Sequence, residues 1–167
     1  MSANLRFSTN TVDGKKYLGG PLITGANGIF STSATAANLV FDEVLKSENI
    51  AGTPDYRCLY LQNDFSNQTI YEPKLEVVSM TDTAAFTIGL LTDKNVNAQS
   101  IGSETTVPTG ITFTDIGLST PVNLVQGPSN FLLPGEFIGF WIKRTPQNLG
   151  ASGTVTGEFI FQLRYKT

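Results

Sequence analysis

The side chains that carry most enzymatic chemistry are scarce in this sequence. It contains no histidine, which excludes the Ser-His and Cys-His catalytic arrangements and the usual zinc sites. Its single cysteine, Cys58, stands in an apolar run, where a thiol without a neighbouring base is an inert buried side chain. The chain also lacks a GxxxxGK[ST] loop and a GxGxxG turn between a strand and a helix, so no phosphate-binding loop is predicted.

Fourteen acidic side chains remain as candidates for acid–base chemistry or cation binding. Asp42 and Glu43 are adjacent, but neighbouring residues in a strand point to opposite faces and do not converge on one substrate. Four aspartates stand in polar segments that we interpret as solvated turns, without the spacing of an EF-hand. They are Asp64, Asp82, Asp93 and Asp115. The sequence therefore predicts no catalytic residue, no metal-binding residue and no cofactor.

Three aromatic side chains could stack on a sugar ring in a lectin-like site. They are Tyr56, Tyr60 and Trp141. They lie in two runs, 55–63 and 136–145, that carry apolar residues at both odd and even positions. Such runs are typical of central strands covered on both faces. We therefore expect the three rings in the core, where each contributes about 2–3 kcal/mol through burial. Arg57, in the first run, is expected to form a weak surface pair with a glutamate.

Alternation of apolar and polar residues predicts further strands. They span 69–79, 86–90 and 157–165. Pro73 indicates a bulge or a sheet edge near the start of the first, because proline cannot donate to a sheet ladder. The Pro-Gly pair within Leu132–Glu136 predicts a type II turn. We expect the polar segment 93–108 to be an exposed loop.

Residues 38–45 fit two patterns. Val40 and Val44 have helical spacing, whereas Leu39 and Phe41 fit a strand. We expect a strand here, followed by a tight turn around residues 46–49.

Seven to nine short strands without a clear helix predict an all-β fold, an antiparallel two-sheet β-sandwich of jelly-roll or immunoglobulin-like type. We expect residues 36–167 to form this single sandwich domain, with residues 1–35 as an N-terminal arm or its first strands. An arm could lie on the body or on a neighbouring subunit, and a mobile terminus is the alternative. A chain of 167 residues buries roughly 70% of its unfolded surface, so disulfides and metals are not needed for stability.

Charge and hydropathy argue against nucleic acid and membrane as partners. The net charge is −3 and no Lys/Arg cluster is present, which argues against nucleic-acid binding through phosphates. No apolar run reaches the length of a transmembrane helix, about 18 residues. The first residues lack the apolar stretch of a signal peptide, so we expect synthesis in a cytoplasm without export by the usual route.

Three segments taken together resemble a known class of protein. They are Asn38–Val44 with Glu48, then Asp55–Asn63, then Leu133–Glu136 leading into Gly139–Thr145. The order F-D-(D/E)-V, D/E-Y-R-C-x-Y-x-x-N, L-x-P-G-(E/Q) and W-x-(K/R)-R-T is similar to that of small virion structural proteins of tailed bacteriophages. It spans about two-thirds of the chain, and the middle segment is its most specific part.

The resemblance implies a non-enzymatic decoration (cement) protein on the capsid exterior, made in the host cytoplasm and located in the virion. The implied partners are the major capsid protein or neighbouring virion proteins, and a homotrimer is the expected oligomer. No catalytic residue or cofactor is implied. Two alternatives stay open, a tail or baseplate structural protein and a carbohydrate- or receptor-binding β-sandwich module.

Overall fold

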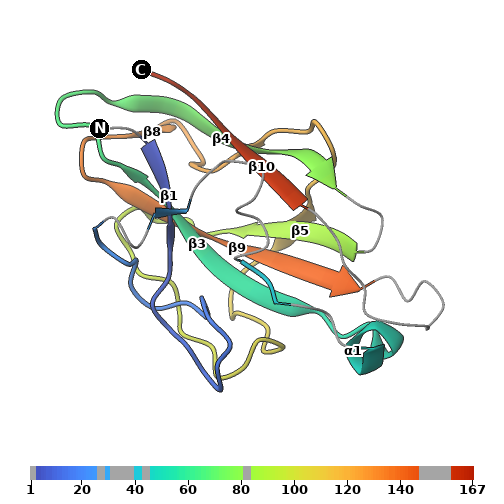
Figure 1. The fold of residues 1–167 in the computed structure, drawn as a ribbon. Coiled ribbons are helices and arrows are strands. Elements are labelled where there is room, and N and C mark those ends of the chain that lie inside the picture. The colour runs from blue at the N-terminus through green and yellow to red at the C-terminus, as the bar shows by residue number, and fades with distance from the viewer. Residues whose placement is uncertain (1–2, 26–28, 31–39, 43–45, 81–83, 147–158) are drawn as a thin grey trace.

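The computed structural model describes residues 3–25, 29–30, 40–42, 46–80, 84–146 and 159–167 of the chain. Within this part the protein is all-β, with ten strands in two antiparallel sheets and a single short helix, α1 (Lys46–Ala51) (Figure 1). The predicted all-β class is confirmed. None of the helical structure described is long and apolar enough to cross a membrane.

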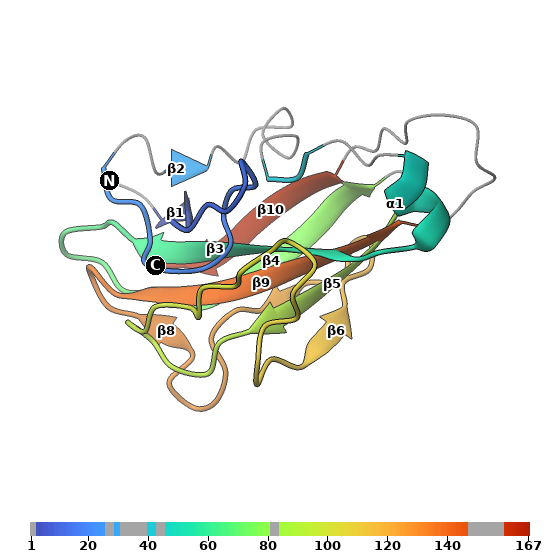
Figure 2. The ribbon, with the colours of Figure 1, turned by 90° about the horizontal axis from the view of Figure 1, so that it is seen from below.

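The larger sheet has six strands and the smaller has four. In spatial order the larger contains β2 (Ile29–Phe30), β1 (Ala3–Phe7), β3 (Asp55–Asn63), β9 (Phe137–Pro146), β5 (Ala84–Leu90) and β6 (Phe113–Asp115). The smaller contains β10 (Phe159–Lys166), β4 (Ile70–Met80) and β7 (Val122–Asn123), with β8 (Phe131–Leu132) also paired to β4. In Figure 2, β4 and β10 lie behind β3 and β9.

β3 and β9 are the two middle strands of the larger sheet and are buried along most of their length. Their register runs from Asp55 opposite Arg144 to Gln62 opposite Phe137. The prediction that both strands are covered on two faces is therefore confirmed. β1 pairs with β3 on its other edge, so the first strand of the chain belongs to the larger sheet.

One face of β3 and β9 packs against the smaller sheet. Leu59 and Leu61 of β3 share a core cluster with Leu75 and Val77 of β4 and with Leu132 of β8. All five side chains are fully buried. Residues from the two sheets thus alternate toward one apolar layer, as antiparallel strands with a buried face require.

The opposite face of β3 and β9 is covered by two loops instead of a sheet. Trp141 lies in this second cluster together with Leu18 and Ile101. Leu18 comes from the segment 8–22, and Ile101 from the segment 93–108, which the sequence predicted to be an exposed loop. That prediction is wrong for Ala98 and Ile101, which are buried because they pack against the apolar outer face of the two central strands.

A buried tyrosine joins the two covering loops to the sheet. The Tyr60 hydroxyl accepts a hydrogen bond from the Ala98 N–H at 2.7 Å and donates one to the Gly20 carbonyl. The Gly20 N–H in turn donates to the Ala98 carbonyl at 3.0 Å. Tyr56, Tyr60 and Trp141 are all buried, so their predicted place in the core is confirmed and they offer no surface to a sugar.

Two local predictions are confirmed and one is wrong. Glu72, before Pro73, has φ +47°, and the β4–β10 register slips between Arg164 and Lys166, so β4 carries the predicted bulge. The Pro-Gly turn has Gly135 at φ +83° and a hydrogen bond from the Glu136 N–H to the Leu133 carbonyl, as in a type II turn. The tight turn expected at 46–49 is instead the start of α1. The expected strand 38–45 lies largely outside the described residues.

We predict that Tyr60→Phe lowers the free energy of unfolding by about 1–3 kcal/mol, because the buried Ala98 N–H loses its hydroxyl acceptor. Tyr165→Phe is the matched control, because Tyr165 is exposed, and its effect should stay within about 0.5 kcal/mol. Urea denaturation of both variants measures the difference. Equal stabilities of the two variants would contradict the role given to the Tyr60 hydroxyl.

Candidate functional site

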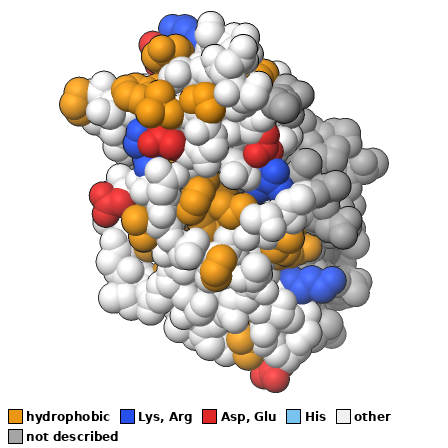
Figure 3. Space-filling view, turned by 90° about the vertical axis from the view of Figure 1, so that its left-hand side faces the viewer, with side chains coloured by type: hydrophobic (Ala, Val, Ile, Leu, Met, Phe, Trp, Pro, Cys, Tyr) orange, Lys and Arg blue, Asp and Glu red, His pale blue; other side chains and the backbone are white. Residues whose placement is uncertain are grey.

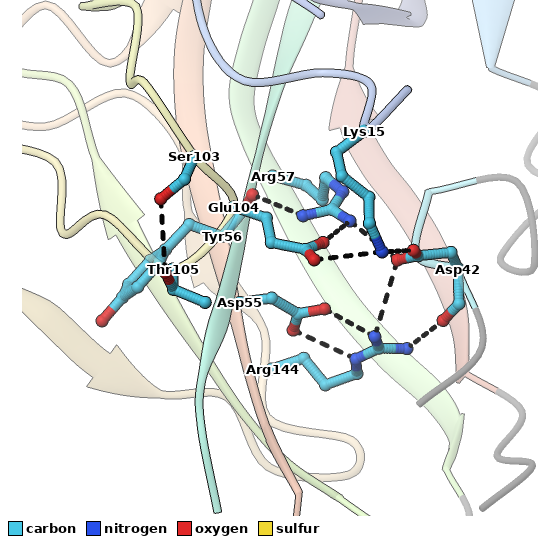
Figure 4. Close-up of polar contacts among 9 residues, drawn as sticks. All are labelled: Lys15, Asp42, Asp55, Tyr56, Arg57, Ser103, Glu104, Thr105 and Arg144. Carbon is cyan, nitrogen blue, oxygen red and sulfur yellow. Dashed lines mark hydrogen bonds and ion pairs between the residues drawn. The ribbon is translucent and has the colours of Figure 1, made fainter. Parts of the chain in front are cut away.

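Six charged side chains meet where β3 begins (Figure 4). The cations are Lys15, Arg57 and Arg144, and the anions are Asp42, Asp55 and Glu104. We call this set the ion cluster. Its members come from five separate stretches of the chain, and its formal charges cancel.

The edge of β3 explains how distant residues reach the ion cluster. β1 pairs with β3 only from Leu59 onward. Beyond that point the Cys58 N–H donates to the Tyr17 carbonyl and the Tyr56 N–H donates to the Glu104 carbonyl, each at 2.8 Å. These bonds satisfy backbone donors of a buried strand, and they hold the Lys15 and Glu104 regions beside the first residues of β3.

Arg57 is the most deeply buried cation of the cluster, with 1% of its surface exposed. Its guanidinium donates to Asp42 at 2.8 Å and to Glu104 at 2.6 Å, and also to the Tyr56 carbonyl at 3.0 Å. The predicted weak surface pair with a glutamate is therefore wrong. A glutamate is present, but both partners lie inside a network in which a buried guanidinium requires several acceptors.

Arg144 forms the second half of the cluster. It binds the Asp55 carboxylate with two nitrogens, at 3.1 and 2.5 Å, and donates to the Asp42 backbone carbonyl at 2.7 Å. The Phe41 ring lies under both guanidinium groups, with Arg144 at 4.7 Å and Arg57 at 5.4 Å from its centroid. Cation–π contacts of this kind favour delocalised arginine charges.

The environment shifts the acidities of the cluster in different directions. Burial alone would raise the pKa of Asp42, but the hydrogen bond from Lys15 and the charge of Arg57 hold that pKa below its usual value. Burial alone would lower the pKa of Lys15, but its hydrogen bonds to Asp42 and Glu104 raise that pKa above its usual value. Burial raises the pKa of Asp55 despite the opposing charge of Arg144. As the pH falls, Asp55 therefore takes up a proton before Asp42 does.

The geometry of the ion cluster suits stabilisation better than catalysis or metal binding. Carboxylate oxygens of Asp42, Asp55 and Glu104 lie within 4.8 Å of one another, but lysine and arginine groups already occupy the space that a metal ion would need. The hollow beside Asp55 and Arg144 has room for about one water molecule. The charged groups bind each other and leave no open position for a substrate at this site.

The other chemically competent residues are dispersed. Asp64 binds Arg6 at 2.7 Å, far along β3 from the cluster. Asp93 and Asp115 belong to no group of three acidic or thiol side chains within the described residues. Asp82 and Glu43 lie outside those residues. Cys58 is fully buried, as expected, and burial raises the pKa of its thiol.

The far end of β3 is fixed by a second set of polar contacts. The Asn63 side-chain amide donates to the carbonyls of Gln68 and Leu132, both at 2.8 Å. Its backbone N–H donates to the Glu136 carbonyl and its carbonyl accepts from the Gly135 N–H. Asn63 thus binds the turn that leads into β9.

Described residues of the three segments that the sequence analysis singled out lie at these two ends. Phe41 and Asp42 come from the first, Asp55 and Arg57 from the second, and Arg144 from the third. Lys15 and Glu104 complete the cluster, and no motif in the sequence marks them, since an isolated lysine or glutamate in a polar stretch is an ordinary surface residue. No family model, curated protein or solved structure matches this chain.

We predict that Arg57→Met lowers the free energy of unfolding by about 2–4 kcal/mol. This is toward the low end of the range for a broken buried pair, because Lys15 still faces both carboxylates. Lys143→Met, on β9 and outside the ion cluster, is the matched control and should cost about 0.5 kcal/mol or less. If chemical denaturation found the two substitutions equally tolerated, the cluster would not stabilise the fold.

Proposed function

We propose that this protein is a non-enzymatic structural component of a tailed-bacteriophage virion, a decoration protein that binds and stabilises the capsid exterior. The observation that carries the proposal is the convergence of Asp42, Arg57 and Arg144, which stand in three separate resembling segments. The convergence shows that the three segments are coupled in this fold, and it supports treating their resemblance to virion proteins as a single pattern.

The arrangement of the sheets supports a rigid binding module. The apolar layer between Leu59 of β3 and Leu75 of β4 fits a two-sheet sandwich, of the jelly-roll or immunoglobulin-like type expected from the sequence. Loops packed on the outer face and ion pairs at the start of β3 further restrain the position of the central strands. A decoration protein has to keep its shape on a lattice, and preorganisation reduces the entropy lost on binding.

The chemistry of the candidate site supports a role without catalysis. At the ion cluster each charged group binds another group of the protein, and the adjacent hollow holds about one water molecule. Catalysis would need a group free to act on a substrate, held in a cleft that admits one. The proposed partners are the major capsid protein or neighbouring virion proteins, contacted by a homotrimer in the assembled virion.

We predict that purified phage particles contain this chain in hundreds of copies, because a decoration protein follows the capsid lattice. Quantitative mass spectrometry against the major capsid protein measures that ratio. Purified protein added to undecorated heads should sediment with them. Six copies, or a multiple of six that stays with tails after head removal, would assign it to the tail or baseplate. Absence from particles would refute a virion role.

A further inference from the structure

A hydrophobic surface lies at the end of the molecule where β8 pairs with β4. Tyr71 and Leu133 are 48% and 47% exposed, and the partly buried Phe131 ring lies 6.1 Å from the Tyr71 ring. We call these three residues the β8 patch. Figure 3 shows hydrophobic side chains gathered in a band across the upper part of this side, with acidic and basic side chains above and below the band.

The bulge in β4 turns Tyr71 outward. Leu75 and Val77 point into the core, and regular alternation from them would also point residue 71 inward. Glu72, at φ +47°, inserts the extra residue, so Ile70 is buried and Tyr71 is exposed. A left-handed conformation is unfavourable for glutamate and persists only where the surrounding structure imposes it. The fold therefore contains a strained residue whose effect is to expose an aromatic ring.

Two lysine–glutamate ion pairs border the β8 patch. Lys94 lies 4.6 Å from the Phe131 ring centroid and binds Glu136 at 3.0 Å. On the other side Lys166, opposite Tyr71 in the sheet register, binds Glu72 at 2.7 Å. An exposed aromatic centre with a polar, charge-balanced border is the usual composition of a protein–protein interface.

We propose that the β8 patch is the contact surface between copies of this chain. The inference deepens the homo-oligomer of the proposed function and rests on it. Charge complementarity favours an identical copy: one lysine and one glutamate lie on each side of the patch, so Lys94 or Lys166 of one copy can face Glu72 or Glu136 of another. A nucleic acid or an anionic membrane would favour an excess of positive charge at this border.

The test compares Tyr71→Glu and Leu133→Glu with Val107→Glu. Val107 is an exposed apolar residue, 60% accessible, outside the β8 patch. Light scattering after size exclusion, over a range of concentrations, gives the mass of each variant. We expect the wild type and Val107→Glu to be oligomers. We expect the two patch variants to dissociate with a constant raised about 30-fold or more, as loss of a central interface contact causes.

Cooperative urea unfolding of the monomeric variants, with midpoints lowered only by the stabilisation that association adds to the wild type, would show that dissociation does not result from misfolding. The proposal is overturned if the wild type is a monomer at all concentrations, or if both patch variants keep the wild-type mass. If the mass is kept but binding to undecorated heads is lost, the patch contacts a particle protein, which also overturns it. An oligomer that dissociates as expected but never binds heads or occurs in particles would support this interface and contradict the virion role.

Discussion

The buried central strand β3 must have its backbone and charged groups satisfied inside the protein, and this requirement positions much of the surrounding chain. β9 supplies partners along one edge, and β1 supplies them along part of the other. Where β1 ends, the Tyr17 and Glu104 carbonyls continue the hydrogen bonding. An unpaired buried amide costs about 1–3 kcal/mol, so the hydrogen bonds from these loops contribute to the stability of the fold.

The same requirement explains contacts among the three segments that the sequence analysis singled out. Asp42 joins the two arginines, because its carboxylate accepts from Arg57 and its backbone carbonyl accepts from Arg144. Losing any one of the three weakens the contacts of a buried guanidinium or carboxylate. Asn63 has a corresponding role at the opposite end of β3 through its contacts with the turn before β9. Residues of the three segments therefore stabilise both ends of β3. The proposed contact surface between copies lies around the bulge of β4 and shares one residue, Leu133, with the third segment.

Prediction from the sequence succeeded where one residue or one local pattern determines the structure. Apolar residues at both parities placed β3 and β9 in the centre, Pro73 indicated the bulge, and Pro-Gly indicated the turn. It failed where the structure depends on contacts between distant segments. Arg57 looked like a surface residue because its acceptors, 15 and 47 positions away, cannot be recognised from spacing. The loop around Ile101 looked exposed because it contains few apolar residues. They are buried only because the fold brings them against the outer face of β3.

Amide hydrogen exchange of β3, followed residue by residue by NMR, tests most directly whether β3 and the loops at its edge form one cooperative unit. We expect the Tyr56 and Cys58 amides, which are bound by loop carbonyls, to exchange as slowly as the amide of the core residue Leu59. All three should then exchange only through global unfolding. Fast exchange at Tyr56 and Cys58 beside a protected Leu59 would contradict the account, because the loops and the ion cluster would then open independently of the sheet.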